Sequence, residues 1–378
     1  MSKYLAFLLL FITVNSYAQF TISGRVINKT DKKPVEAAVA FLNKTGIAST
    51  ATDSGSFTLN NVPQGHYLLL VTIVGYDGYK IPITVTGNMR LPQIELTPKN
   101  ESLNGVTVKG KFKPSPYYYL FKDEFLGSTL FARQCKIVNP WAILFYNTDK
   151  QGNYSAKSND FIEIENDALG YKIKVLLTYF TKDFATDQTS YDGDSYFEEM
   201  KGTPEQERTW EKNRMECYRG SVMQFLRAIL AGTTKQEGFQ IRKAYLQKNP
   251  YYDPMEIYDD MIDDAYLYKI TDTTVREEDI FSKTNKPGLF ALTRGSTNPN
   301  ACMYIEYHEP NYVMQTGKKA PRVPWIWVNT SSYILFEKPY TVFDYNGIIN
   351  TNGNVMFTGF LAEARVANQL PVDFQPTQ

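Results

Sequence analysis

The sequence predicts a small all-β sandwich of the Ig-like or transthyretin-like type, followed by an α+β domain. From residue 19 to residue 98, short segments alternate apolar and polar residues with turn residues between them, and no helical period appears. After residue 116, helix signals mix with strand-like segments. The chain has 378 residues, of which 43% are hydrophobic and 21% are charged, so it can bury more than one core.

The N-terminal end has the pattern of a secretory signal peptide. Lys3 supplies a positive charge, residues 5–14 are an apolar run, and Ser16-Tyr17-Ala18 resembles a cleavage site. The apolar run is shorter than the ~20 residues that a membrane-spanning helix needs. We therefore expect removal of residues 1–18 and export to the periplasm or outer membrane, with no transmembrane span and at most peripheral membrane association.

The strands of the predicted sandwich follow one another between Phe20 and Leu96. In the first of them, Phe20, Ile22, Gly24 and Val26 alternate with polar neighbours. Turns are expected at Asp53-Ser54-Gly55 and at Pro63-Gln64-Gly65, because these residue types favour turn conformations. The further strand candidates are 38–42, 56–59, 67–74, 81–85 and 91–96.

Short motifs within this region point to a known type of domain. They are Ser23-Gly24-Arg25-Val26, Pro34-Val35, Thr52-Asp53-Ser54-Gly55-Ser56-Phe57, Val62-Pro63-Gln64-Gly65-His66-Tyr67 and Val74-Gly75-Tyr76. Together they resemble the carboxypeptidase regulatory-like domain. The resemblance covers residues 19–98 and implies a transthyretin-like accessory sandwich that is not itself catalytic.

A linker is expected between the sandwich and the second domain. Residues 99–116 are rich in Pro, Gly, Ser and Lys, which is typical of connecting segments. The α+β domain then covers residues 117–378. Its predicted elements include a helix around 118–125 and strands at 141–146, 303–307, 325–328, 333–336 and 355–360.

A hairpin is predicted early in this domain, with strands at 161–165 and 171–179. Asn166-Asp167 and Gly170 supply the turn between them. Along the second strand, one set of residues alternates with Lys172 and Lys174 and is expected on a single buried face. This set is Tyr171, Ile173, Val175, Leu177 and Tyr179.

Two consecutive helices are predicted after the hairpin. Thr203 is a candidate N-cap because Pro204 follows it and Gln206 lies three residues further on, which is the capping-box spacing. The helix runs through Trp210, and Gly220 interrupts the helical pattern. A second helix then ends at Gly232.

Several stretches of the second domain also look familiar. They are 125–129, 135–140, 164–171, 210–214, 218–221 and 225–227. Taken with the sandwich, they resemble uncharacterised exported carboxypeptidase-like regulatory domain-containing proteins of Gram-negative bacteria. This resemblance spans nearly the whole chain, places the protein in the cell envelope and implies no reaction.

Charge and motif content argue against several functions. The formal net charge of +0, without a long basic run, disfavours nucleic acid as a partner. His66 and His308 lack the His-x-x-Glu spacing of a zinc carboxypeptidase, and two histidines cannot form a three-His site. No nucleophile-elbow pentapeptide and no phosphate-binding glycine loop occurs. We therefore expect no metal or other cofactor and assign no catalytic residue.

The three cysteines leave two questions open. Cys135, Cys217 and Cys302 allow one disulfide and one free thiol in an oxidising compartment, or three buried small side chains. Cys217 lies between Arg214 and Arg219, which would favour a reactive thiolate. Its helical phase also aligns it with Trp210, which favours burial instead.

Two further features were weighed as sites. The densest acidic region is 253–279, where a helix would place Asp259, Asp260, Asp263 and Asp264 together. We interpret this as a solvated helix face rather than a cation site, because the EF-hand spacing is missing. Trp325 and Trp327 share one face of a predicted strand and are the candidates for stacking on a ligand.

The function that follows is a non-catalytic, exported cell-envelope protein that binds an envelope protein or glycan through its C-terminal domain. The alternative is a glycan hydrolase in that domain, which would use two carboxylates. A concave site with two opposed carboxylates, one of them raised in pKa by burial, and with aromatic walls would favour the hydrolase.

Overall fold

The computed structural model describes residues 19–99, 114–146, 149, 152–184, 188–248, 266–286, 288–308, 331–349, 354–362 and 364–376. The chain divides into two compact units. Unit 1 contains residues 1–43 and 47–103, and unit 2 contains residues 44–46 and 104–378. The predicted fold class, an all-β sandwich followed by an α+β domain, is confirmed.

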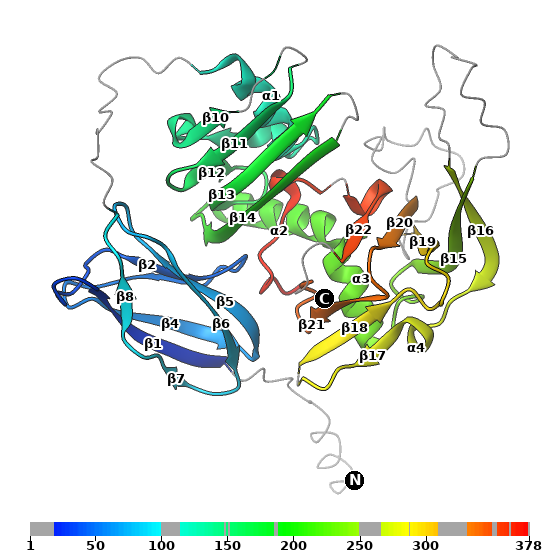
Figure 1. The fold of residues 1–378 in the computed structure, drawn as a ribbon, viewed down its shortest axis with the longest axis horizontal. Helices are drawn as coiled ribbons and strands as arrows, with labels where there is room; N and C mark the ends of the chain where they lie inside the picture. The colour runs from blue at the N-terminus through cyan, green and yellow to red at the C-terminus, as the bar shows by residue number, and fades with distance from the viewer. Residues whose placement is uncertain are drawn as a thin grey trace, which may run out of the picture. The chain divides into compact units, whose positions relative to one another are not determined.

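Unit 1 consists of one mixed sheet and one antiparallel sheet (Figure 1), which share one apolar core. Gly55 closes a turn with φ +74°, and a Cβ there would lie 2.2 Å from the Val26 carbonyl oxygen, so only glycine fits. One sheet contains β1 (Gln19–Asn28), β4 (Ser56–Pro63), β7 (Met89–Arg90) and β8 (Ile94–Leu96). The other contains β2 (Val39–Leu42), β3 (Ala48–Thr50), β5 (Gly65–Thr72) and β6 (Tyr79–Val85).

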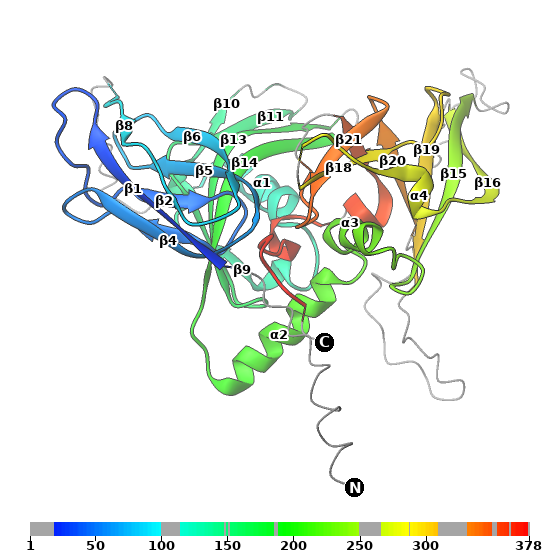
Figure 2. The same cartoon turned by 90° about the horizontal axis from the view of Figure 1, so that it is seen from below.

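The first sheet of unit 2 is covered on one face by helix α1 (Pro116–Leu126), as Figures 1 and 2 both show. Phe121 and Phe125 of α1 stack on each other at 4.8 Å, and Phe121 meets the ring of Phe180 at the same distance. The sheet has the order β10-β11-β13-β12-β9, and β14 pairs with β13. Its strands are β9 (Cys135–Ile137), β10 (Ile143–Tyr146), β11 (Tyr154–Ser158), β12 (Ile162–Asn166), β13 (Tyr171–Asp183) and β14 (Gln188–Glu199).

The long strand β13 differs from its prediction at one point. The register with β14 shifts between Leu177 and Tyr179, which is the mark of a β-bulge. After the bulge Phe180 takes the buried face with no exposed area, and Tyr179 is 39% exposed. The prediction that Tyr179 shares the buried face is therefore wrong, because the extra residue reverses the alternation from that point on.

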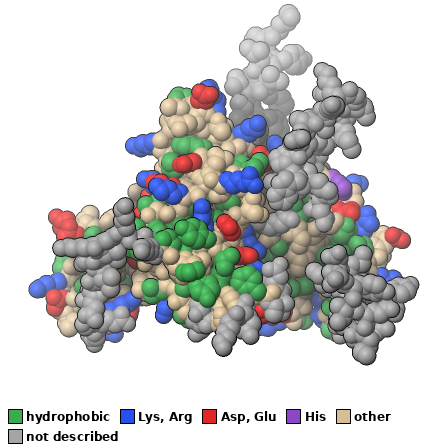
Figure 3. Space-filling view, turned by 90° about the horizontal axis from the view of Figure 1, so that it is seen from above, with side chains coloured by type: hydrophobic (Ala, Val, Ile, Leu, Met, Phe, Trp, Pro, Cys, Tyr) green, Lys and Arg blue, Asp and Glu red, His purple; other side chains and the backbone are tan. Residues whose placement is uncertain are grey.

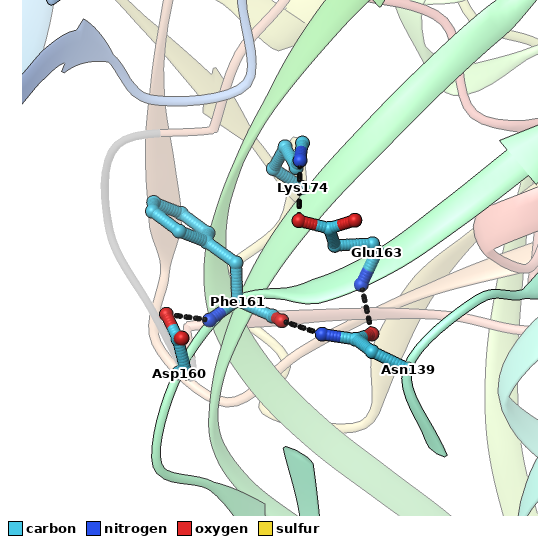
Figure 4. A network of polar contacts seen from close by, with 5 residues as sticks. All are labelled: Asn139, Asp160, Phe161, Glu163 and Lys174. Atoms are coloured by element: carbon cyan, nitrogen blue, oxygen red, sulfur yellow. Dashed lines mark hydrogen bonds and ion pairs between the residues drawn. The ribbon is translucent and has the colours of Figure 1, made fainter. Parts of the chain in front are cut away.

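Polar contacts hold the other end of this sheet (Figure 4). The Asn139 side chain donates to the Phe161 carbonyl at 2.8 Å and accepts from the Glu163 amide at 2.7 Å. Glu163 and Lys174 are cross-strand partners, and their charged ends lie 2.6 Å apart. The charges in this part of the sheet are thus already paired within the protein.

Helices α2 (Pro204–Tyr218) and α3 (Val222–Ala231) follow the sheet, and Figure 2 shows the change of direction between them. The capping box is present: the Thr203 hydroxyl accepts from the Gln206 amide, and the Gln206 side chain accepts from the Thr203 amide. Gly232 ends α3 in the left-handed conformation with φ +68°. These predicted boundaries match the structure because capping depends on neighbouring residues only.

One face of α2 is hydrogen-bonded to the turn between β12 and β13. Trp210 donates its ring N–H to the Asp167 carbonyl at 2.8 Å, and Arg214 donates to the Leu169 carbonyl at 2.8 Å. Gly170 has φ +68°, and a Cβ there would lie 2.2 Å from the Trp210 ring. The turn can therefore approach the helix only because this position has no side chain.

The remainder of unit 2 contains two more sheets, with the orders β16-β15-β19-β20-β22 and β17-β18-β21. The first has strands β15 (Phe239–Lys248), β16 (Tyr266–Thr274), β19 (Ala301–Tyr307), β20 (Ser331–Phe336) and β22 (Val355–Phe357). The second has strands β17 (Phe281–Lys283), β18 (Leu289–Thr293) and β21 (Tyr340–Asp344), next to α4 (Glu277–Ile280).

Short 3-10 helices replace parts of two predicted strands. The segment predicted as a strand at 141–146 begins inside η2 (Pro140–Ala142), and the one predicted at 355–360 stops at Phe357 before η4 (Gly359–Ala362). Two others, η1 (Ala132–Gln134) and η5 (Val366–Asn368), precede β9 and the C-terminal segment. None of the helices in the described part of the chain is both long and apolar enough to cross a membrane.

Several sequence predictions fall outside the described residues. These are the signal peptide over residues 1–18, most of the 99–116 linker, the acidic helix face of Asp259, Asp260, Asp263 and Asp264, and the strand that carries Trp325 and Trp327.

Candidate ligand-binding cavity

A cavity of about 460 Å³ lies in unit 2, within the ~300–1,000 Å³ that small-molecule sites occupy. Its walls come from the C-terminal end of α1, the loop after it, the α2–α3 junction, η4 and the residues up to η5. Both apolar and charged side chains line it. We call it the Arg365 cavity.

Two contacts hold its walls together. α1 stops at Gly127, which has φ +94°, and the side-chain carbons of Arg365 lie only 3.0–3.1 Å from where a Cβ would stand. In the following loop, the Thr129 hydroxyl donates to the Asn368 side-chain oxygen at 2.9 Å. Segments more than two hundred residues apart in sequence therefore form one wall.

A nearly buried ion pair fixes the charge at one side of the cavity. Glu124 accepts from Lys182 at 2.9 Å and from the Thr189 hydroxyl at 2.7 Å. The Lys182 side chain is only 3% exposed. Burial alone would raise the pKa of Glu124, but the hydrogen bonds from Lys182 and Thr189 lower it below its ordinary value. Glu124 is therefore ionised at neutral pH.

The thiol of Cys217 also lines the cavity, 3.8 Å from the Asn368 amide nitrogen. Burial raises its pKa from 9.0 to about 12. The raised pKa is contrary to the hypothesis of a reactive thiolate between Arg214 and Arg219. The side chain is half-buried, so the burial favoured by its helical phase with Trp210 is only partly observed. Cys135 and Cys302 are buried, and all three cysteines are free thiols in this structure.

We expect slow alkylation of Cys217 in the folded protein. At pH 8 a thiol of pKa about 12 contains up to about a thousandfold less thiolate than one of pKa 9.0. Iodoacetamide labelling followed by peptide mass spectrometry should give a rate that rises about tenfold per pH unit from pH 8 to 10. A rate that levels off near pH 9 would contradict the buried, protonated thiol, and labelling in urea is the control.

A second hollow in unit 2, of about 690 Å³, has one feature expected of a hydrolase site, a carboxylic acid whose pKa is raised by burial. Burial raises the pKa of Asp373, which lines it together with Glu199. Of its three aromatic residues, Trp210 is 6% and Tyr171 is 2% exposed, and Phe374 is half-buried. The Arg214 guanidinium also lies 3.9 Å from the centre of the Tyr171 ring. We call it the Asp373 hollow.

The sequence pointed to few of these residues. Trp325 and Trp327, the candidates for stacking, lie outside the described residues, so the structure does not place them. Within the described ranges, no group of His, Cys, Asp and Glu side chains is arranged to hold a metal ion. Glu124, Lys182 and Arg365 belong to no local motif. Of the lining residues, the sequence had pointed to Cys217 and Arg219 and to parts of the stretches 125–129 and 218–221.

Unit 1 has the fold of an Ig-like or transthyretin-like β-sandwich. Residues 22–108 match the family profile of the CarboxypepD_reg-like domain, which confirms the resemblance of the N-terminal motifs. The N-terminal unit is therefore a carboxypeptidase regulatory-like domain. The match ends before the elements of unit 2 begin, so it identifies this domain and not the whole chain.

Solved structures resemble parts of the chain at low similarity. A type II cohesin–X-dockerin complex from Acetivibrio cellulolyticus is 19% identical, with 20% of this chain and 56% of that chain covered and a TM-score of 0.19. A DUF3823 family protein from Bacteroides ovatus is 10% identical, with coverages of 76% and 91% and a TM-score of 0.18.

A second DUF3823 family protein, from Bacteroides uniformis, is 8% identical, with coverages of 90% and 99% and a TM-score of 0.17. The chain spans only about half of the length of the cohesin–dockerin chain. No curated protein matches the chain. At these TM-scores the similarities carry no argument about what the protein does.

Proposed function

We propose that the protein is a non-catalytic binding protein of the cell envelope, exported by its N-terminal signal peptide. Its second unit binds an envelope glycan or protein, and the Arg365 cavity is the ligand site. Unit 1 supports this role as an accessory sandwich with its own core.

The observation that carries the proposal is the state of the titratable groups in the cavity. Glu124 is held as a carboxylate by Lys182, and Cys217 is held as a thiol by burial. A general acid or base needs a pKa near the working pH, and a nucleophilic cysteine needs a lowered one. These groups instead keep one protonation state at neutral pH, which suits a site that binds a ligand without reacting with it.

The remaining lining fits a polar ligand without a large net charge. The two positive charges of Arg219 and Arg365 balance the two negative charges of Asp123 and Glu216, and the charge of Glu124 is paired with Lys182. Hydroxyl and amide groups supply further hydrogen bonds, and aromatic rings supply apolar contact. These residues are Ser128, Thr129, Ser221, Asn368, Phe131 and Phe360.

The alternative is a carboxylate-dependent glycan hydrolase at the Asp373 hollow. The raised pKa of Asp373 specifically favours this candidate, because a general acid must stay protonated while a second carboxylate is ionised. Under this alternative, Asp373→Asn abolishes release of new reducing ends from peptidoglycan. Under the leading proposal, the wild-type protein releases no new reducing ends, and Asp373→Asn binds the ligand with the affinity of the wild type.

Filling the cavity is expected to abolish ligand binding. Ala364 is an exposed residue of its lining, so Ala364→Trp blocks the space without removing a buried contact. The probes are soluble peptidoglycan fragments and purified outer-membrane proteins, measured by isothermal titration calorimetry. We expect saturable binding of one probe class to the wild type and a loss of at least about tenfold in affinity in the variant.

The matched control is Ser282→Trp, which adds the same ring at an exposed position of β17, outside the cavity lining. The protein is purified from the periplasmic fraction, and its intact mass checks that it begins at Gln19. Binding that survives Ala364→Trp, or no binding of either probe class, would sink the proposal.

A further inference from the structure

The outer face of the first sheet in unit 2 carries an unusual row of side chains near the edge strand β10. The first row combines two cross-strand pairs, Leu144 of β10 with Lys157 of β11 and Tyr179 of β13 with Asp192 of β14, next to the point where Ala156 pairs with Phe180. The adjacent row contains Tyr146, Ser155, Thr181 and Ser190. We call these two rows the β10 platform.

The apolar members of the platform are exposed, although burial does not alternate strictly along their strands: β11 is buried at three consecutive residues and β13 contains the bulge. Leu144 is 38%, Tyr146 is 37% and Tyr179 is 39% exposed, whereas Ala156 and Phe180 on the opposite face are fully buried. Ordinary alternation would place polar residues on the wet face. Tyr179 reaches it only through the β-bulge in β13, and bulges commonly re-aim a side chain at a functional site.

Neighbouring groups restrain both tyrosine rings. The Tyr179 hydroxyl lies 3.5 Å from the Ser190 hydroxyl, and the Lys157 ammonium lies 5.7 Å from the centre of the Tyr146 ring. Restrained rings lose little conformational freedom when a ligand covers them. On the face drawn in Figure 3, hydrophobic side chains gather in patches among charged ones, so exposed apolar groups also occur together on this protein.

The side chains of the platform indicate which class of ligand it can bind. Its charges are one Lys157 and one Asp192, which cancel, so neither a polyanion nor a polycation gains from it. In the second row Thr181 and Ser190 are exposed and can offer hydroxyl groups to a ligand, whereas Ser155 is buried. A protein hot spot would instead place its aromatic anchors in a desolvated, well-packed pocket. A flat surface of rings and hydroxyls suits a ligand with apolar C–H faces and hydroxyl edges.

We propose that the β10 platform binds a neutral polysaccharide chain, whose sugar rings stack on Tyr146 and Tyr179. The inference rests on the proposed binding role but uses the opposite sheet face from Lys182, which contacts the Arg365 cavity residue Glu124. At the other end of the sheet, Glu163 and Lys174 are paired with each other (Figure 4), so the platform ends before that pair.

The test is affinity gel electrophoresis of the mature protein in hydroxyethylcellulose, xylan and galactomannan, with alginate as an anionic comparison. We expect at least one neutral polysaccharide to retard the wild type. The double variant Tyr146→Ala/Tyr179→Ala should bind at least about tenfold more weakly, and Tyr146→Phe/Tyr179→Phe should keep most of the affinity because the rings remain. The double phenylalanine variant should melt like the wild type because both rings remain. The double alanine variant removes rings that are only 37% and 39% exposed, so circular dichroism must show that it keeps the wild-type fold before affinities are compared.

Tyr340→Ala is the matched control, because Tyr340 is 50% exposed on β21 in a different sheet. Equal retardation of the wild type and the double alanine variant, retardation by alginate alone, or no retardation in any gel would overturn the platform. Ala364→Trp is run in parallel. The gel experiment can fail while Ala364→Trp still loses its binding of peptidoglycan fragments or protein in calorimetry. In that case the proposed function stands and only the platform proposal is wrong.

Discussion

Replacing Arg227 by methionine is expected to lower the free energy of unfolding of unit 2 by about 3–5 kcal/mol. The guanidinium donates to the carbonyls of Asn346 at 3.1 Å, Phe374 at 2.9 Å and Val372 at 2.9 Å. These bonds tie the C-terminal segment and the loop after β21 to helix α3. Methionine keeps much of the volume but leaves three half-buried carbonyls without a charged donor.

Urea denaturation followed by tryptophan fluorescence measures this effect on unit 2, because all four tryptophans belong to it. Arg208→Met is the control: Arg208 is exposed on α2, and its replacement should change stability by less than about 0.5 kcal/mol. Arg227→Lys should recover only part of the loss, because a single ammonium cannot copy the planar fork of donors. Equal stability of Arg227→Met and the wild type would show that the three contacts contribute nothing.

Replacing Lys182 by methionine is expected to cost about 2–4 kcal/mol at neutral pH. The change leaves the Glu124 carboxylate without its cation, and the value is discounted because Glu124 is 31% exposed. Glu124→Gln removes the carboxylate partner of the Lys182 ammonium, which is 3% exposed, and should cost a similar amount. The double variant Lys182→Met/Glu124→Gln should be more stable than the sum of the two losses predicts, because both charges of the pair are removed together.

The pH dependence of the same pair has a definite sign. The folded-state pKa of Glu124 is lowered from 4.5, so its stabilising contribution is complete above about pH 4.5 and is lost as the pH falls through the folded-state pKa. The stability gap between the wild type and Glu124→Gln should therefore narrow on acidification below pH 4.5. Urea midpoints measured from pH 7 to pH 3 test this, and a gap that widens would contradict the ionised pair.

Local signals explain why parts of the fold could be predicted from the sequence. The start of α2 at Thr203 and the end of α3 at Gly232 depend on groups within a few residues of each position. Buried and exposed residues alternate over the first half of β4, and the Gly55 turn needs a left-handed residue. The family match of residues 22–108 uses the same local motifs.

The strands that were missed lack such signals. β14 and β15 contain charged and polar residues on one face and gain their conformation mainly by pairing with β13 and β19, respectively. Strand propensity depends on cross-strand neighbours, which the sequence does not reveal. The bulge that exposes Tyr179 is likewise a property of the pairing between β13 and β14.

The sequence by itself determined the order of a β-sandwich and an α+β domain, the ends of α2 and α3, and the identity of the N-terminal domain, because periodicity, caps and turn residues act over a few positions. Only the tertiary structure decided the rest. It paired Glu124 with Lys182, joined Thr129 to Asn368 at a separation of 239 residues, and partly buried the Cys217 thiol, whose pKa is raised. A cavity wall or a buried charge depends on which distant segments the core brings together, and no local pattern encodes that contact.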